Sequence, residues 1–486
     1  MAVVWLLVFA VAAGVAQQLY LLIVVAIATL VGGCCRSCFR YPSVVFFLLA
    51  CACGANGWSS SARLARDRAC FEHASAAAGS ALVSLEGMVT SFPQTGLHGT
   101  SFEFATVLEE RRVQLQIRAE RFDVAYGDRY RVRARLLNST PAGLRFLASR
   151  GLAGSARVRY SEMSLAGRGG NIVVRECFWP LHRFVRTRLS RALGGDAGLA
   201  IGMLLGERGQ IDEPVRDAVR RLGITHLLAI SGMHLTTIAA CVMLLVRMWP
   251  RRRAQVLLLS LSAYTAMVGG VESLTRAYLM ALVLLAAHAT VRPLRAIDAL
   301  GKALFVMALA VPLSLRSVGL QLSFAATFAV LCCLPAKSHA REHHGARQHV
   351  RRALGSVRTA FLLSIAVELF IAPLQLYHFH MLSAVGPVAT VVFFVPVTLV
   401  LLGAAPVAAL TAFLPAGEWP GSVLGAMTTW TNELIVACGR LAPAPLEISG
   451  PSPWLYYGGL FLGWRLRRRP AAWALAGALM ATAFLC

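Results

Sequence analysis

Polar side chains that could line a path or move protons stand inside the apolar stretch 226–248. Four of them follow one another at spacings of three or four residues: Ser231, His234, Thr237 and Cys241. On a helix this spacing places them on one face, and His226 stands at the start of the stretch. Polar groups inside a membrane span are costly and usually face a water-filled path, but a packing seam between helices gives the same pattern. The residues alone leave both interpretations open.

Charged and amide side chains also stand at the beginning or in the middle of other apolar stretches. Glu272 and Arg276 begin one stretch four residues apart, and Gln321 and Ser323 begin another. Arg276 could contact a polyanion, or it could extend to the membrane surface or pair with Glu272. Glu368 lies within a third stretch, where it would suit the proton site of a secondary transporter.

A serine and a histidine are also the minimum that an intramembrane hydrolase would need, with Ser231 as nucleophile and His226 or His234 as base. Two features count against this interpretation. The residue two before the serine is Ala229 rather than glycine, and no carboxylate stands nearby in the sequence to orient the base. A phosphate-binding loop is also missing, because Lys302 is followed by alanine. We therefore expect no enzyme activity, no cofactor and no metal ion.

These residues belong to a chain whose composition is that of a membrane protein. Of its 486 residues, 57% are hydrophobic and 14% are charged, and the mean hydropathy is +0.63. Soluble domains are about 45–50% apolar and about 25% charged, so a soluble enzyme, a disordered regulator and a small disulfide scaffold are excluded. We predict a polytopic α-helical membrane protein with about a dozen spans. Its apolar stretches are 3–16, 19–33, 43–57, 226–248, 255–270, 273–291, 296–315, 318–334, 358–378, 383–414, 422–440, 454–464 and 471–485.

The placement of arginine predicts the orientation of these spans. The basic loops are 251–253, 292–295, 337–352 and 465–469. Because basic loops remain in the cytoplasm, the polar segment 58–178 is expected outside it. The polar residues that begin the apolar stretches then fall in the outer half of the membrane, where they would line one vestibule.

The polar segment 58–178 contains the alternation of apolar and polar residues that is typical of β-strands. The runs are 113–119 and 129–136, with shorter ones near 82–90, 156–160 and 171–175. Five or so short strands predict a small extracytoplasmic β-barrel of the OB type, a fold that often binds single-stranded nucleic acid. The polar face of 129–136 consists of four arginines, which form either a solvated surface or a surface that follows phosphates.

The same segment has one cysteine near each end, Cys70 and Cys177. Lone thiols in an oxidising compartment often pair, so we predict a disulfide between them. The arginine-rich stretch 179–195 predicts an amphipathic helix on the membrane surface. The chain then divides into N-terminal membrane helices at 1–57, the OB-like domain at 58–178, surface helices at 179–225 and a membrane channel domain at 226–486.

Five stretches form a specific combination when they are taken together and in order. They are GMLLGERGQID at 202–212, HLLAISGMH at 226–234, Thr275-Arg276-Ala277, the stretch 317–326, and the stretch 138–151 of the polar segment. This combination resembles the ComEC family of competence proteins over about residues 80–465. The resemblance implies a multi-pass channel of the bacterial cytoplasmic (inner) membrane that takes up single-stranded DNA during natural transformation.

The resemblance also implies partners: single-stranded DNA, membrane lipids, and separate DNA receptor, cytoplasmic motor and nuclease proteins, with a homo-oligomer as one form of the pore. Many family members continue into a metallo-β-lactamase-like nuclease domain. This chain has no His-x-His-x-Asp-His cluster, so a form without that domain is expected. An intramembrane hydrolase and a proton-coupled secondary transporter remain the alternatives. The candidates for channel lining or DNA contact are His226, Ser231, His234, Arg276, Gln321, Ser323 and Glu368.

Overall fold

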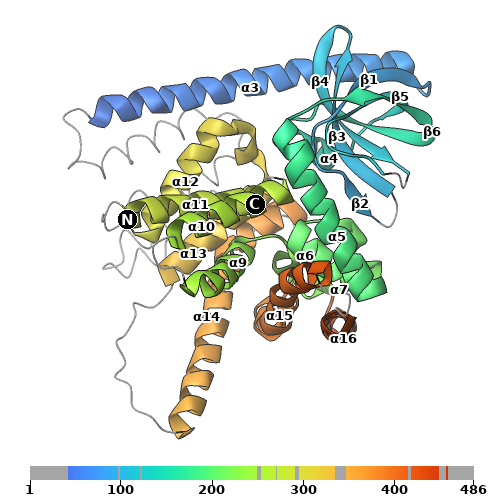
Figure 1. Ribbon diagram of the computed structural model, residues 1–486. Helices are drawn as coiled ribbons and strands as arrows, with labels where there is room; N and C mark the ends of the chain where they lie inside the picture. The colour runs from blue at the N-terminus through green and yellow to red at the C-terminus, as the bar shows by residue number, and fades with distance from the viewer. Residues whose placement is uncertain are drawn as a thin grey trace.

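A β-barrel lies on one side of the molecule and a bundle of helices on the other, and the long helix α3 (Pro42–Ala78) runs across both (Figure 1). The predicted stretches 3–16, 19–33 and 471–485 lie outside the described residues. This computed structural model describes residues 42–96, 99–120, 123–248, 253–269, 271–289, 295–333, 346–413, 418–447 and 456–457.

The barrel is built from strands in which buried and exposed residues alternate. They are β1 (Val83–Val89), β2 (Gln94–Gly96), β3 (Gly99–Leu108), β4 (Arg111–Ala119), β5 (Asp128–Leu137) and β6 (Gly154–Arg168), with helix α4 (Pro141–Ser149) between the last two. The order is β1-β5-β6-β4-β3-β2, and pairing of β1 with β3 closes the sheet. Inward side chains such as Phe104, Leu115 and Val132 are fully buried because successive strand residues point to opposite faces. The prediction of a small OB-like barrel is confirmed.

Four of the five predicted strand regions occur as β1, β4, β5 and β6, and β2 and β3 are additions. The strand predicted near 171–175 is wrong, because the chain is helical from residue 172 onward and includes the π-turn Val174–Phe178. The Asn171 side chain explains the difference. Its Oδ1 accepts hydrogen bonds from the N–H groups of Val173 and Val174 at 2.9 and 3.4 Å. An asparagine in this position satisfies N–H groups that have no partner within the helix.

Helix α3 extends the predicted apolar stretch 43–57 without a break into the barrel domain. Near its end, Phe71 is buried in the core of the barrel. Gly154 of β6 makes this contact possible, because a Cβ there would overlap the Phe71 ring. Further back along the helix, Ser61 accepts a hydrogen bond from Arg316 of the bundle at 3.2 Å. Helix α3 is therefore attached to both halves of the molecule.

The bundle has two apolar cores. One joins α5, α6, α15 and their neighbours, and the second joins α12, α13 and α14. The helices are α5 (Trp179–Leu193), α6 (Ala197–Leu205), α7 (Glu213–Arg221), α8 (Thr225–Leu228), α9 (Gly232–Leu245), α10 (Arg253–Val268), α11 (Glu272–Ala289), α12 (Ala296–Ala310), α13 (Val318–Cys333), α14 (Ala346–Phe379), α15 (Gly386–Phe413) and α16 (Glu418–Leu441).

Two helical segments are long and apolar enough to cross a membrane, Val357–Phe379 in α14 and Gly386–Ala408 in α15. Shorter apolar helices are Gly232–Leu244, Arg253–Val268 and Val318–Cys333. Within the described part of the chain, the structure thus has two candidate spans. The number of about a dozen stays a prediction.

The amphipathic helix predicted over 179–195 occurs as α5. Its buried residues include Leu189 and Leu193, which belong to the larger apolar core. Helix α5 contacts α6, α15 and α16, and two of its four arginines, Arg183 and Arg191, are exposed. It is therefore a packed element of the bundle, and a position at the membrane surface stays a prediction for its arginine face alone.

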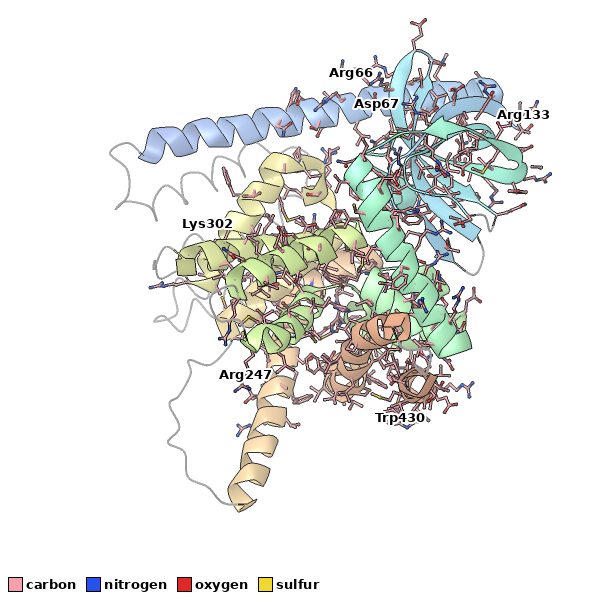
Figure 2. The ribbon with its side chains drawn as sticks, in the orientation of Figure 1. Arg66, Asp67, Arg133, Arg247, Lys302 and Trp430 are labelled. Atoms are coloured by element: carbon pink, nitrogen blue, oxygen red, sulfur yellow. The ribbon has the colours of Figure 1, made fainter. Side chains whose placement is uncertain are left out.

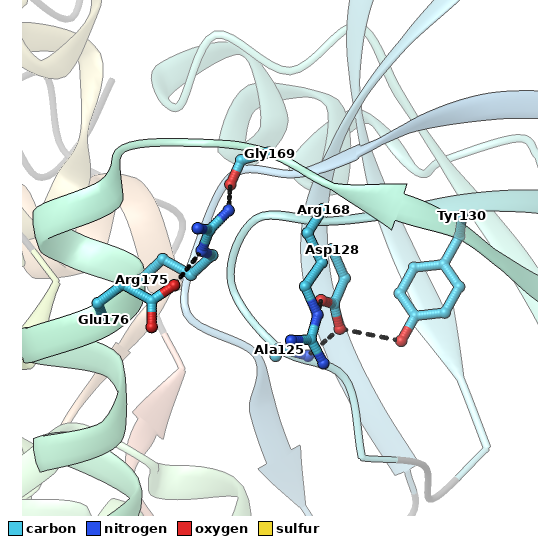
Figure 3. A network of polar contacts seen from close by, with 7 residues as sticks. All are labelled: Ala125, Asp128, Tyr130, Arg168, Gly169, Arg175 and Glu176. Carbon is cyan, nitrogen blue, oxygen red and sulfur yellow. Dashed lines mark hydrogen bonds and ion pairs between the residues drawn. The ribbon is translucent and has the colours of Figure 1, made fainter.

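Polar contacts hold the end of the barrel that leads into α5 (Figure 3). The Tyr130 hydroxyl donates to Asp128 Oδ2 at 3.2 Å, and Asp128 Oδ1 lies 3.7 Å from Arg168 Nε. Burial, together with the neighbouring Asp128 carboxylate, raises the pKa of the Tyr130 hydroxyl, so it remains a donor. Arg175 then donates to the carbonyl of Gly169 at 3.2 Å and ties the end of β6 to the first helical turn.

Candidate functional site

Arg276 of α11 is almost fully buried, with 5% of its surface exposed. Its Nε donates a hydrogen bond to Ser323 Oγ of α13 at 2.9 Å, and its guanidinium lies over the Phe324 ring, 5.7 Å from the centroid. Nη1 lies 3.4 Å from the sulfur of Met280. Among the residues that the structure describes, no carboxylate pairs with Arg276. A guanidinium has five N–H donors, so these neighbours leave part of its capacity for an anion unused.

Glu272, one turn before Arg276, has a different partner. Its Oε2 accepts a hydrogen bond from Ser317 Oγ at 2.5 Å, and the backbone at Gly319 lies against the same carboxylate. The Glu272–Arg276 ion pair that the spacing left open is therefore not formed in the structure. The arginine keeps its charge without an acid beside it.

Ser231 and His234 form the beginning of α9 and do not lie within one long helix. The helix expected over 226–248 is broken, because α8 ends at Leu228 and Ser231 has an extended backbone. Ser231 Oγ accepts a hydrogen bond from the Met233 N–H, and His234 Nδ1 accepts one from the Ser231 N–H, both at 3.2 Å. This arrangement is a capping box, in which two side chains satisfy N–H groups at the start of a helix. Ser231 therefore caps the helix, and His234, Thr237 and Cys241 follow it within α9.

The break places the backbone of Gly232 beside the arginine. A Cβ on Gly232 would lie 3.5 Å from Arg276 Nη2. The capping box of α9, Arg276 of α11 and Ser323 of α13 thus adjoin one another, although they come from three separate stretches of sequence. Gly206, from a fourth stretch, lies against Ile230 of the same turn. The structure therefore brings together four of the predicted site residues.

The three other predicted site residues have different surroundings. Gln321 of α13 is buried, and its Oε1 lies 2.9 Å from His378 Nε2 of α14. Glu368 of α14 lies beside Gly386 at the start of α15. His226 is exposed on α8. None of the three is hydrogen-bonded to Arg276 in the described structure.

A buried histidine–glutamate pair, which the residue pattern did not reveal, lies where the barrel meets the bundle. His182 and Glu207 are both 0% exposed. His182 Nε2 lies 2.8 Å from Glu207 Oε1, and His182 Nδ1 lies 2.9 Å from the Met267 carbonyl oxygen. Glu207 Oε2 accepts a hydrogen bond from Gln210 at 3.0 Å and lies 3.6 Å from Arg186 Nη1. The pair is fully satisfied, as buried ionisable groups must be if the fold is to tolerate them.

Aromatic rings and a close backbone contact enclose this pair. Trp179 stacks on His182 with centroids 5.5 Å apart, and Phe92 of the barrel lies 5.3 and 5.4 Å from these two rings. Nearby, Gly96 of the barrel lies so close to Gly209 of the bundle that a Cβ on the latter would sit 2.8 Å from the Gly96 Cα. We call this contact region, formed by these five residues and Glu207, the junction. It fixes how the barrel attaches to the helices.

Of the buried histidine–glutamate pair in the junction, only Glu207 was indicated by the sequence. Glu207 is an acid at the end of the apolar run 198–206, and such an acid needs a buried partner. His182 gave no signal, because it stands among arginines of α5 whose charges dominate the pattern.

Cys70 and Cys177 are both free, so the predicted disulfide is not formed in the structure. Cys70 Sγ lies 3.4 Å from the Leu108 carbonyl oxygen at the β3–β4 turn. Cys177 is exposed in the π-turn before α5, and that turn contacts α5 and α10. The two thiols bracket the polar segment in sequence, but they lie on different elements in space.

Glu103 on β3 has a half-buried carboxyl group, which lies 3.1 Å from the Arg150 guanidinium. Burial raises the pKa of Glu103, and Arg150 offsets only part of this effect. The contribution of Glu103 to the free energy of unfolding of the barrel therefore depends on pH.

Comparisons with known proteins identify one family. The sequence model described as "Competence protein" matches residues 203–470, which is more than half of the chain. The chain is 28% identical over 265 residues to "ComE operon protein 3" of Bacillus subtilis (strain 168), and this match covers 54% of the chain and 32% of that protein. The matched part therefore spans about a third of the length of that relative. No solved structure matches the chain.

Proposed function

Because the chain belongs to the competence protein family, we propose that it is an inner-membrane channel that admits single-stranded DNA during natural transformation. The observation that carries this proposal is the buried Arg276, which has no acid beside it within the described structure and lies between the α9 capping box and Ser323. A phosphate chain that leaves water needs cations and hydrogen-bond donors in place of its hydration shell. Arginine supplies both in a planar arrangement that fits phosphate.

The arrangement around the arginine supports a path and not only a packing contact. Three helices contribute to it, and each contributes a break or a polar group: the start of α9, Arg276 of α11 and Ser323 of α13. Non-helical backbone and polar groups at membrane depth are tolerated where they are buried in protein or line a water-filled cavity. Two candidate spans, in α14 and α15, support membrane association of the same domain.

The finer features of the channel belong to the same proposal. We propose about a dozen spans, the division of the chain at residues 57, 178 and 225, and an extracytoplasmic position for the barrel. Gln321, Glu368 and His226 are proposed to line the path at other depths. A DNA receptor, a cytoplasmic motor and a nuclease would be separate proteins, and the pore would form from one or more copies of the chain.

Uptake of labelled DNA in a strain without this gene tests the proposal. Wild-type protein should restore uptake, Arg276→Lys should restore part of it, and Arg276→Gln should restore very little, because lysine keeps the charge but not the bidentate geometry. Protein abundance in the membrane is measured in parallel. Normal uptake in the strain without the gene would contradict the channel function.

A hydrolase is less well supported by the same geometry. Ser231 Oγ and His234 Nδ1 are 3.2 Å apart, which is within reach for proton transfer. The same nitrogen accepts the Ser231 N–H, however, and His234 Nε2 has no hydrogen-bond partner in the described structure, so no carboxylate orients the ring. Loss of uptake in Ser231→Ala at normal stability would favour the hydrolase. Proton flux that disappears in Glu368→Gln would favour the transporter.

A further inference from the structure

Three arginines lie side by side on the outer surface of the barrel. Arg118 of β4 is paired with Arg157 of β6, and Arg157 is paired in turn with Arg135 of β5. All three side chains are exposed. We call these three residues the arginine row. The strand alternation in the sequence indicated that Arg118 and Arg135 point outward, but the row itself depends on the register of three strands.

The row is unfavourable for the barrel alone. Like charges directly opposite one another on a sheet are destabilising, and here three stand in succession. In the part of the chain that the structure describes, none of the three forms an ion pair. Elsewhere on the same domain arginines do have acids: Arg131 with Glu86, Arg111 with Asp67, Arg168 with Asp128 and Arg150 with Glu103. Three adjacent arginines without an acid in the described structure, on a domain where other arginines have one, indicate an external anion.

The position of the row favours a soluble polyanion over a membrane surface. Strands β5 and β6 lie on the side of the barrel away from the helical bundle (Figure 1), and Arg133, the next outward residue of β5, projects from that side (Figure 2). The side chain of Arg159 is exposed on β6, two residues from Arg157. The outward positions of β3, by contrast, include Glu103 and no arginine. The basic surface is therefore confined to β4, β6 and β5.

We propose that the arginine row binds the phosphate backbone of the incoming single strand before it reaches the helices. This inference rests on the channel function proposed above. Adjacent guanidinium groups on neighbouring strands present bidentate donors at intervals, which suits a flexible chain of phosphates. OB-type barrels commonly bind through their second and third strands, so the row would extend the binding surface onto β6 and β5.

Binding by the purified full chain in detergent tests the proposal, with a fluorescent oligothymidine of about 30 nucleotides as the probe. The variant Arg118→Gln/Arg135→Gln/Arg157→Gln should bind roughly 100-fold more weakly at about 0.1 M salt, and the slope of log K against log salt should fall by about 2. The matched control removes three paired arginines, Arg68→Gln/Arg111→Gln/Arg131→Gln, and so changes the net charge equally. It should bind within about threefold of wild type.

Thermal unfolding provides a second measurement that a purely structural role would not reproduce. Removing the row should leave the barrel as stable as wild type or more stable, because the repulsion disappears with it. Equal weakening of binding by both triple variants would overturn the proposal, since only net charge would then matter. Unchanged binding by the row variant would overturn it as well.

The two proposals can fail separately. If cells without the gene take up DNA normally, the channel function fails whatever the oligonucleotide measurement shows. If uptake depends on the chain but the row variant binds and transports as wild type does, only the arginine row fails. In that case, tight binding of the row variant to vesicles of anionic lipid would not restore the arginine-row proposal. A joint loss of lipid and oligonucleotide binding by the wild type at high salt would not restore it either.

Discussion

Within the described residues, the barrel carries its unpaired arginines on an exposed surface, whereas the bundle holds Arg276 in a buried position. On the barrel, Arg118, Arg135 and Arg157 are exposed on a sheet whose stability comes from an apolar core on the other face. In the bundle, Arg276 is buried and held by Ser323 and the Phe324 ring. The barrel can therefore change its charges without changing its fold. In the bundle, every polar change alters packing and chemistry together, so stability has to be measured beside function.

The junction contains buried polar groups whose replacement alters packing and chemistry together. A substitution there should therefore have the largest effect on stability. Replacing Glu207 with alanine leaves the buried His182 and the half-buried Arg186 without their acid, and we expect a loss of about 3–5 kcal/mol in the free energy of unfolding. Thermal unfolding in detergent measures it. The control is Asp217→Ala, an exposed acid of α7, which should change stability by less than about 0.5 kcal/mol. Equal stability of the two variants would remove the contrast between the regions.

Arg276 should show the next largest effect, and in function more than in stability. Arg276→Met should lower DNA uptake by about 10- to 100-fold, which is the loss of one charge-assisted contact. Stability should be unchanged or higher, because the variant removes a buried charge that has no acid beside it in the described structure. The double change Glu272→Gln/Arg276→Gln should not recover uptake. Recovery would show that the two residues act as a pair after all.

A smaller effect is expected at the start of α9. Ser231→Ala removes the cap and should cost about 1 kcal/mol in stability, with uptake largely retained. Ser231→Asn supplies another capping oxygen and should recover most of that stability. If both variants lose uptake while remaining as stable as wild type, the hydroxyl itself takes part in chemistry.

The smallest effect is on the barrel and depends on pH. The pKa of Glu103 is raised above its ordinary value, so between these two values the folded barrel binds more protons than the unfolded chain. Stability from this group is therefore lost as the pH rises through that interval. Glu103→Gln keeps the neutral form, so its stability relative to wild type should increase from pH 4 to pH 7 in urea unfolding. A relative stability that falls with pH would contradict the sign.

The barrel could be predicted from the sequence because strand alternation is a local property. β4 and β5 show it over their whole lengths, and their inward residues are the ones buried. Register is not local. No pattern within β4, β5 or β6 states that Arg157 stands between Arg118 and Arg135, since bulges in β6 shift the pairing.

The candidate site was predictable in composition but not in geometry. Ser231, Arg276 and Ser323 were chosen as polar residues in apolar stretches, and they do adjoin in the structure. The helix break at Ser231 was not predicted, although the serine–histidine spacing is that of a capping box and a glycine follows the serine. The disulfide was wrong because the order of cysteines in a chain gives no distance between them.

Helix α3 gives the molecule a mechanical property. It has 37 residues, so at 1.5 Å per residue it is a rod about 55 Å long. One end is seated in the barrel through Phe71, and Ser61 is tied to the bundle by Arg316. A rod held near its middle acts as a lever about that point. A tilt of about 10° would move its ends by several ångströms in opposite directions, so a rearrangement at the N-terminal end of α3 would be transmitted directly to the barrel.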